Sequence, residues 1–336
     1  MGTNTGTTIV FVCGSARVIT RTPSAPRWRR LFTFLLGSMT TLAVPARGEV
    51  MYVSPPRNIV QVSPTGAVSP FASAALPGNI FGMAFNSSGN LYYGAGGQIN
   101  KISSAGGTVS LFATVPGGAG CGLAFDSGGS LYAAGHGYSS IPPQGPQAIS
   151  KVSADGAVSL FATVFGASVW GLAFDPSGNL YASQDTQISK ITPSGTVSVF
   201  ATLPGVVHGL AFDSGGILYA ADYSDGLIDK ISSTGAVSLF ATLPGNPLID
   251  GGNPTPPDGL AFDGSGKLYA AEEFDNQIVQ ISQDGLTVSP FVTVGNARFV
   301  AFGPAIPEPT VPEPSSFVLL AVAAGSLLLR RRRRRA

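Results

Sequence analysis

The residue in front of a repeated Gly-Leu-Ala-Phe tetrapeptide changes from copy to copy, and its types are ones that can do chemistry. The segment GLAFDSGGSLYAA spans residues 122–134, and near-copies begin at Gly82, Gly171, Gly209 and Gly259. A shortened version, FVAF, occupies residues 299–302. The six preceding residues are Phe81, Cys121, Trp170, His208, Asp258 and Arg298. Because the repeat does not dictate these identities, they are candidates for a ligand site carried on a repeated scaffold.

A second set of candidates follows the repeated LYAA stretch. Asp222 comes directly after it in one copy, and Glu272 does so in the next. Further acidic residues follow closely, namely Asp225, Glu273 and Asp275. Together with His208 and Asp258, Asp222 and Glu272 would supply the nitrogen and oxygen ligands that calcium or a catalytic zinc prefers. A divalent cation, Ca²⁺ or Zn²⁺, is therefore a candidate cofactor. The alternative interpretation is that these residues are solvated acidic loop positions.

The aromatic candidates also allow two interpretations. The indole of Trp170 offers a face on which a sugar ring can stack, or it plugs a central channel together with Phe81. His208 could simply cap the same channel. No histidine stands in a recognisable triad order with serine, so the sequence does not argue for serine hydrolase chemistry.

The elements that must position these residues are four short strand-like runs in each copy. A copy reads GLAF, an Asp-x-x-Gly turn, LYAA, a variable stretch, Ile-x-Lys-Ile-Ser, a second glycine turn and VSLFAT. β-Branched and aromatic runs divided by Gly, Asp, Asn and Ser predict strands joined by hairpin turns. Four strands in a period of roughly 40 residues predict a blade of a β-propeller.

Each strand type occurs six times, although only five copies are complete. The extra second, third and fourth strands precede the first copy at residues 50–54, 59–63 and 67–73, and the extra first strand is residues 299–302. We therefore predict an all-β, six-bladed propeller over residues 49–304, closed by pairing of the N- and C-terminal strands. In such a ring the innermost strands line the axis, and the six variable residues ahead of them surround the mouth of the central channel.

Two sets of repeated polar residues are given structural interpretations. The residues that start the first turn are expected to hydrogen-bond its backbone amides, because one acid per turn suits an Asx turn and calcium needs six or more oxygens. They are Asn86, Asp126, Asp175, Asp213 and Asp263. The lysines of the third strand are interpreted as solvated positions. They are Lys101, Lys151, Lys190 and Lys230.

The C-terminal residues 311–336 combine three features in a fixed order. Pro312, Glu313 and Pro314 precede a 15-residue apolar stretch over residues 315–329, and six consecutive arginines follow it. This tail resembles the PEP-CTERM sorting signal of Gram-negative bacteria. The resemblance implies a transmembrane sorting helix and an Arg-rich tail over 315–336, a Pro-rich linker over 305–314, and cleavage by an exosortase that recognises Pro312, Glu313 and Pro314. The arginines would stay in the cytoplasm and place the propeller outside.

The N-terminal residues also indicate export. Residues 27–30, which include three arginines, precede an apolar run, and the small residues of VPA at 44–46 offer a cleavage site. We interpret residues 1–46 as a leader and signal peptide. Residues 1–26 make this leader unusually long, so we expect translation to start downstream of Met1. The expected partners are thus the export machinery, the exosortase and, before processing, the inner membrane.

Removing both terminal signals leaves an acidic protein. Seven of the 19 basic residues and all 18 acidic residues lie between Gly48 and Pro314, an excess of eleven negative charges. Nucleic-acid binding requires neutralisation of phosphates and is therefore not expected. Cys13 falls in the leader, so Cys121 has no intramolecular disulfide partner.

The propeller itself resembles the NHL and gluconolactonase-like six-bladed propellers. In the lactonase group a Glu, one or more Asn and an Asp hold a divalent metal at the channel mouth, the Asp lying in a Pro-Asp-Gly before an innermost strand. Pro257, Asp258 and Gly259 match that element. His208 and Trp170 stand where the family has Asn, and no Glu opens the strand FVAF.

Three functions are compatible with these observations. The first is a surface-displayed, non-catalytic module that binds a polysaccharide or protein of the extracellular matrix, and it is the one that we predict. The alternative is a metal-dependent hydrolase or lactonase at the channel mouth. The third is a purely structural repeat protein.

Overall fold

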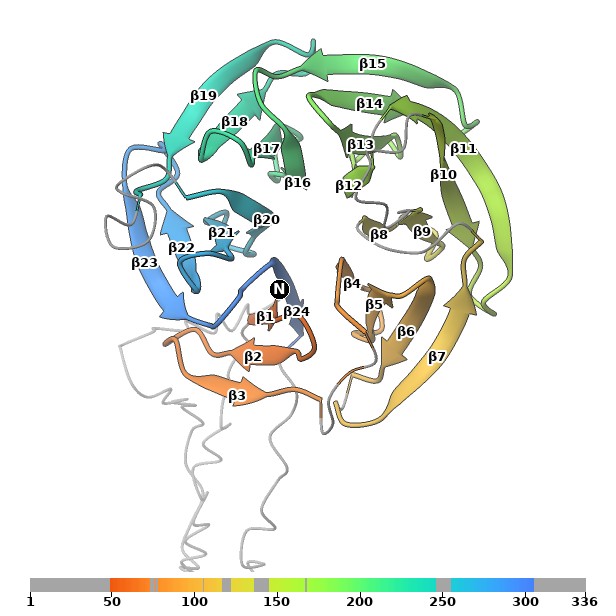
Figure 1. Cartoon of the computed structure of the whole chain (residues 1–336), viewed down its shortest axis with the longest axis horizontal. Helices are drawn as coiled ribbons and strands as arrows, with labels where there is room; N and C mark the ends of the chain where they lie inside the picture. The colour runs from red at the N-terminus through yellow and green to blue at the C-terminus, as the bar shows by residue number, and fades with distance from the viewer. Residues whose placement is uncertain are drawn as a thin grey trace, which may run out of the picture. The chain divides into compact units, whose positions relative to one another are not determined.

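The computed structural model describes residues 49–304, with gaps at 73–75, 77, 105, 117–121, 136–144, 167 and 246–254. These residues form 24 strands arranged in six four-stranded sheets around a common axis (Figure 1). Within this described part, no helix is long and apolar enough to cross a membrane. The predicted leader, the Pro-rich linker, the sorting helix and the Arg-rich tail lie outside the described residues.

The first three blades contain these strands. Blade 1 is β24 (Phe299–Pro304), β1 (Glu49–Ser54), β2 (Val60–Val62) and β3 (Val68–Pro70). Blade 2 is β4 (Met83–Phe85), β5 (Leu91–Ala95), β6 (Gln98–Ile102) and β7 (Val109–Thr114). Blade 3 is β8 (Leu123–Phe125), β9 (Leu131–Ala134), β10 (Gly145–Val152) and β11 (Val158–Gly166).

The other three blades repeat the same antiparallel order. Blade 4 is β12 (Val169–Phe174), β13 (Leu180–Gln184), β14 (Gln187–Ile191) and β15 (Val197–Thr202). Blade 5 is β16 (Val207–Phe212), β17 (Leu218–Asp222), β18 (Leu227–Ile231) and β19 (Val237–Thr242). Blade 6 is β20 (Pro257–Phe262), β21 (Leu268–Glu272), β22 (Gln277–Ile281) and β23 (Val288–Thr293). In each blade the first strand lies nearest the axis and the fourth lies at the rim (Figure 1).

The two ends of the described chain close the ring in blade 1. β24 pairs antiparallel with β1, from Glu49 opposite Pro304 to Ser54 opposite Phe299. The N-terminal strand therefore lies between the C-terminal strand and β2, so closure removes a sheet edge that would otherwise be free. The prediction of a six-bladed, all-β propeller closed by its ends is confirmed.

Glycine opens most of the innermost strands because the axis is crowded. A Cβ atom added at Gly209 would lie 2.7 Å from the carbonyl oxygen of Asp258, and one at Gly259 would lie 2.8 Å from that of Arg298. Real Cβ atoms do not approach a backbone oxygen this closely, so a side chain at these positions would force the inner strands apart.

Neighbouring blades are held together by a repeated aromatic trio. The tyrosine of each second strand packs edge-on or tilted against two phenylalanines, one in or next to the fourth strand of its own blade and one in the first strand of the next blade. Tyr181, for example, lies 4.9 Å from Phe200 and 5.1 Å from Phe212 between ring centroids. Such pairs add to the burial of apolar surface, and Tyr181 belongs to the core between blades 4 and 5.

The structure corrects the interpretation of the repeated lysines and confirms that of the turn residues. The Nζ atoms of Lys101, Lys151, Lys190 and Lys230 lie 5.2 to 5.7 Å from the centroids of tyrosine rings, so these lysines are not merely solvated. In the first turn of blade 5, Asp213 Oδ1 accepts hydrogen bonds from the amides of Gly215 and Ile217, each at 2.9 Å. The equivalent acids do the same elsewhere, as expected for Asx turns.

Candidate ligand site at the channel mouth

Five of the six variable residues meet at one end of the axis. We call this end the mouth face; it carries the loops that enter the innermost strands and the turns between second and third strands. Trp170, His208 and Asp258 are the second residues of β12, β16 and β20, while Phe81 lies two residues before β4 and Arg298 lies directly before β24. Cys121 lies outside the described residues.

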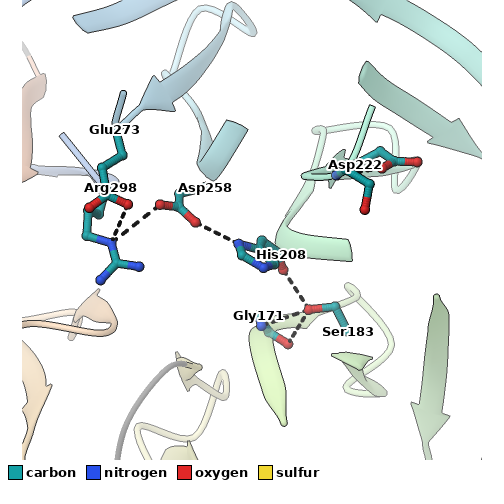
Figure 2. A network of polar contacts seen from close by, with 8 residues as sticks. Gly171, Ser183, His208, Asp222, Asp258, Glu273 and Arg298 are labelled. Carbon is teal, nitrogen blue, oxygen red and sulfur yellow. Dashed lines mark hydrogen bonds and ion pairs between the residues drawn. The ribbon is translucent and has the colours of Figure 1, made fainter. Parts of the chain in front are cut away.

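A chain of polar contacts crosses from blade 5 to blade 1 (Figure 2). His208 Nδ1 lies 2.6 Å from Asp258 Oδ1, and because a carboxylate only accepts hydrogen bonds, Nδ1 carries the proton. Arg298 Nε lies 3.4 Å from Asp258 Oδ2 and 3.1 Å from Glu273 Oε2. Asp258 and Glu273 thus both contact the Arg298 guanidinium, and His208 joins the network through Asp258. Arg298 Cζ lies 5.7 Å from the ring centroid of Phe81.

Three aromatic rings stack beside this chain. His208 lies between Trp170, at 4.4 Å and 20°, and Tyr223, at 4.0 Å and 21° between ring planes. His208 is 7% exposed, whereas Trp170 and Tyr223 are half-buried. The stack is therefore locked at its centre by Asp258 and keeps partly exposed rings on both sides.

The backbone beneath the stack is fixed by a buried serine. Ser183 Oγ donates to the carbonyl oxygen of His208 at 2.6 Å and accepts from the amide of Gly171 at 2.8 Å (Figure 2). Because Ser183 belongs to β13, it joins the inner strands of blades 4 and 5 directly under the residues that carry the stack. A buried hydroxyl with both partners satisfied makes a rigid support.

The carboxyl groups of Asp258 and Glu273 have pKa values shifted in opposite directions. Burial alone would raise the pKa of Asp258, but its hydrogen bond and electrostatic interaction with His208, and the positive charge of Arg298, outweigh burial and lower that pKa. For Glu273, burial and the neighbouring Asp258 carboxylate outweigh Arg298, and the pKa is raised. Asp258 is thus the ionised partner of Arg298.

The structure does not bring the other two metal-ligand candidates to this network. Asp222 pairs with Val207, and Glu272 with Pro257, so their side chains lie on the opposite sheet faces from His208 and Asp258. Figure 2 shows Asp222 apart from the network. Among the described residues, no group of three or more His, Cys, Asp or Glu side chains is placed to hold a metal ion.

Asp222 and Glu272 are instead buried between blades. Asp222 Oδ1 accepts the amide of Ser224 at 3.1 Å, and Glu272 Oε2 accepts from Gln277 Nε2 at 2.7 Å. Each has a second carboxyl oxygen without a hydrogen-bond partner in the described structure. Burial raises the pKa of both, that of Glu272 to about 8.

Sequence reasoning did not single out Tyr223, and it named Glu273 only as a neighbour of Glu272. Both come one residue after the positions selected, Asp222 and Glu272. A shift of one residue along extended backbone moves a side chain to the other face, so the residue after the LYAA-x position points to the mouth. Strand alternation was the signal that could have found them.

Below the stack, a narrow cavity of about 70 Å³ follows the axis. Its wall includes the inner-strand glycines, Trp170 and Phe299, the residue that replaces glycine in blade 1. This volume is small beside the roughly 300 to 1,000 Å³ of sites that enclose a whole ligand. A ligand at this end would therefore lie on the mouth rather than in the channel.

Several solved structures share the general fold of this chain at low sequence identity. A structure of the nidogen/laminin complex matches at 15% identity and a TM-score of 0.63, covering 76% of this chain and 98% of that one. A catalytically inactive H270A virginiamycin B lyase from Staphylococcus aureus, with quinupristin, matches at 13% identity and 0.54, covering 78% and 94%. A putative gluconolactonase matches at 16% identity and 0.51, covering 65% and 79%. The chain has no significant sequence match among curated proteins.

The C-terminus supplies the more specific similarity. Residues 310–334 match the PEP-CTERM protein-sorting motif, which confirms the resemblance predicted from Pro312, Glu313 and Pro314. The protein is therefore an exported β-propeller that is anchored in the membrane before processing by an exosortase and is then presented at the cell surface.

Proposed function

We propose that this exported propeller is a non-catalytic binding module for a polysaccharide or protein of the extracellular matrix, and that its ligand lies on the channel mouth. The observation that carries the proposal is the Trp170–His208–Tyr223 stack, built from blades 4 and 5 and locked through Asp258. A rigid aromatic surface loses little conformational entropy when a sugar ring or an apolar side chain packs on it.

The charges around the stack suit a polar ligand better than a strongly charged one. Asp258 and Glu273 share Arg298, so the rim of the mouth has hydrogen-bonding groups whose charges are largely paired with one another. Paired groups of this kind fix the orientation of a ligand and leave most of the binding energy to the aromatic rings. The sorting motif delivers this surface to the compartment where matrix polymers are found.

Binding of the exported, full-length protein to extracellular polysaccharide and surface protein fractions from the producing cells tests the proposal. Trp170→Ala should weaken binding about tenfold or more, since stacked aromatic anchors contribute about 2 kcal/mol or more at binding hot spots. Phe165→Ala is the matched control, because Phe165 lies on an outer strand and is already 75% exposed. Unchanged binding in both Trp170→Ala and Tyr223→Ala would exclude the mouth as the ligand site.

A metal-dependent hydrolase or lactonase is the second candidate, and the His208–Asp258 pair favours it. A carboxylate that orients an imidazole through Nδ1 leaves Nε2 as a potential general base. The structurally similar virginiamycin B lyase is described as catalytically inactive when one histidine is replaced by alanine. In such a site Asp258 would have to bind the metal ion and also keep its contacts with His208 and Arg298.

Titration of metal-free protein with Ca²⁺ and Zn²⁺ by calorimetry separates the two candidates. A hydrolase site predicts micromolar binding that disappears in Asp258→Asn and persists in Asp284→Asn, which alters an exposed turn far from the mouth. Absence of binding, or binding that the Asp258→Asn change leaves intact, would reject the metal-dependent enzyme and leave the binding module.

A further inference from the structure

We infer that the end of the propeller opposite the mouth carries a second, repeated binding site, in which a groove at each blade junction takes one neutral hexose unit of a polysaccharide. We call this end the turn face; it carries the third-to-fourth strand turns and, in blades 2 to 6, the first-to-second strand turns. The inference uses none of the channel-mouth residues, so it stands or falls independently of the mouth.

Grooves open on the turn face at four of the blade junctions that the structure describes. Their volumes are about 480 Å³ between blades 6 and 1, 380 Å³ between 5 and 6, 300 Å³ between 4 and 5, and 240 Å³ between 2 and 3. All four have the same kinds of residue in their walls: the second-strand tyrosine, a phenylalanine from each adjoining blade, the Asx-turn residue and a turn serine. The groove is therefore a property of the repeat.

The aromatic walls are only partly covered. At the junction of blades 4 and 5, Phe200 and Phe212 are half-buried on either side of Tyr181, and the equivalent phenylalanines of the other described grooves are half-buried as well. Repeated, partly exposed rings at the surface are a recognised mark of ligand sites. Aromatic faces of this kind pack against the C–H side of a pyranose ring.

Polar groups stand at the edge of the same grooves. At the junction of blades 4 and 5, the Tyr181 hydroxyl donates to Asp175 Oδ2 at 3.3 Å, and Lys190 Nζ lies 5.4 Å from the Tyr181 ring centroid. Asp175, Lys190 and Ser232 all belong to the groove wall. A carboxylate, an ammonium group and a hydroxyl together supply the acceptors and donors that sugar hydroxyls require.

Size and charge favour a neutral sugar polymer over other occupants. Three of the grooves lie in the lower half of the roughly 300 to 1,000 Å³ typical of small-molecule sites and the fourth lies below it, which suits one sugar unit each. The chain between Gly48 and Pro314 carries an excess of acidic residues, so a polyanion would be repelled. Weak sites repeated around a ring gain affinity for a repeating polymer because later contacts are intramolecular.

The test uses the exported, full-length protein with glucose, galactose and mannose in equilibrium dialysis, and with dextran, galactomannan and polygalacturonate in affinity electrophoresis. We expect more than one hexose bound per chain, retardation by at least one neutral polymer, and none by polygalacturonate. A combined variant with Phe200→Leu, Phe212→Leu, Phe240→Leu and Phe262→Leu removes the phenylalanine rings of two junctions and keeps apolar side chains there. This variant should bind two fewer hexoses per chain and bind the polymer at least about tenfold more weakly.

Two further variants keep the test decisive. Lys190→Met with Lys230→Met retains the aliphatic stems over the tyrosines and should weaken polymer binding about threefold even if the phenylalanine variant does not fold. Phe165→Leu is the control and should change nothing. A single bound hexose that Trp170→Ala abolishes would overturn the inference while supporting the mouth. Binding unaffected by both groove variants, or no binding of any neutral sugar or polymer, would also overturn it.

Discussion

Carboxyl groups in two regions of the propeller have pKa values shifted in opposite directions. On the turn face, burial tends to raise the pKa of Asp175, but hydrogen bonds from Asn179, the turn amides and Tyr181 outweigh it and lower that pKa. By contrast, burial raises the pKa of Asp229, in the middle of β18, to about 6 and that of Glu272, at the end of β21, to about 8. The difference lies in the hydrogen-bond donors: an Asx turn supplies several amides, whereas Asp229 and Glu272 have too few.

The two faces also differ in how far apart in the sequence their contacting residues lie. The turn face looks alike in blades 2 to 6 because an Asp-x-x-Gly turn, with Asn86 in place of Asp in blade 2, closes the same hairpin in each. The mouth face differs in every blade, since its contacts join residues such as His208 and Asp258 that lie 50 positions apart. Three substitutions, each with a control, test this difference through their effect on the free energy of unfolding, in order of decreasing expected effect.

Asp258→Ala should be the most destabilising. It leaves His208 and Arg298 without their shared carboxylate in a site where Asp258 is 2% exposed, and removing one member of a buried ion pair costs about 3 to 5 kcal/mol. Asp213→Ala on the turn face removes only turn hydrogen bonds and should cost about 1 kcal/mol. Urea unfolding of both variants measures the gap, and equal losses would remove the distinction between the faces.

Gly209→Ala should cost about 3 kcal/mol, because its Cβ atom would lie within 2.7 Å of the Asp258 carbonyl at the axis. Gly216→Ala on the turn face is the matched control. Its φ of +79° disfavours alanine, but the nearest atom to the new Cβ is 3.9 Å away, so we expect a loss of about 1 kcal/mol. Thermal and urea unfolding should rank the two in this order, and the reverse order would show that the axis is not close-packed.

Glu272→Gln should increase stability above neutral pH by about 2 kcal/mol. The folded-state pKa of about 8 lies above the ordinary value of 4.5, so the folded protein keeps a proton that the unfolded chain has lost, and stability falls as pH rises between these values. Glutamine mimics the protonated acid and keeps the contact with Gln277. Unfolding measured from pH 5 to 8 should show a shallower decline than in the native protein.

Asp284→Asn is the control for this pH series. Hydrogen bonds from Ser282 and the Leu286 amide lower the pKa of the exposed Asp284, so it does not titrate between pH 5 and 8. Its slope should match that of the native protein. If Glu272→Gln also left the slope unchanged, Glu272 would be ionised in the folded state despite its burial.

Much of the architecture could be predicted because short sequence patterns specify the strands and turns and recur in each blade. The GLAF, LYAA and VSLFAT runs predicted strands, and the displaced copies at both ends predicted the β24–β1 pairing. The position of the mouth followed from blade topology. The metal-ligand set did not assemble as expected, because register places Asp222 on the opposite sheet face from His208, and sequence spacing does not show on which face each residue lies.

The sequence by itself determined the six-bladed ring, its closure, the Asx turns and the sorting signal, since each can be recognised from short sequence patterns and from the number and order of their copies along the chain. Only the tertiary structure decided the stack of Trp170, His208 and Tyr223, the sharing of Arg298 by two carboxylates, and the positions of lysines over tyrosines. These contacts depend on side-chain direction and on distances between separate strands or blades. Such distances are set by packing of the whole ring, which no single repeat contains.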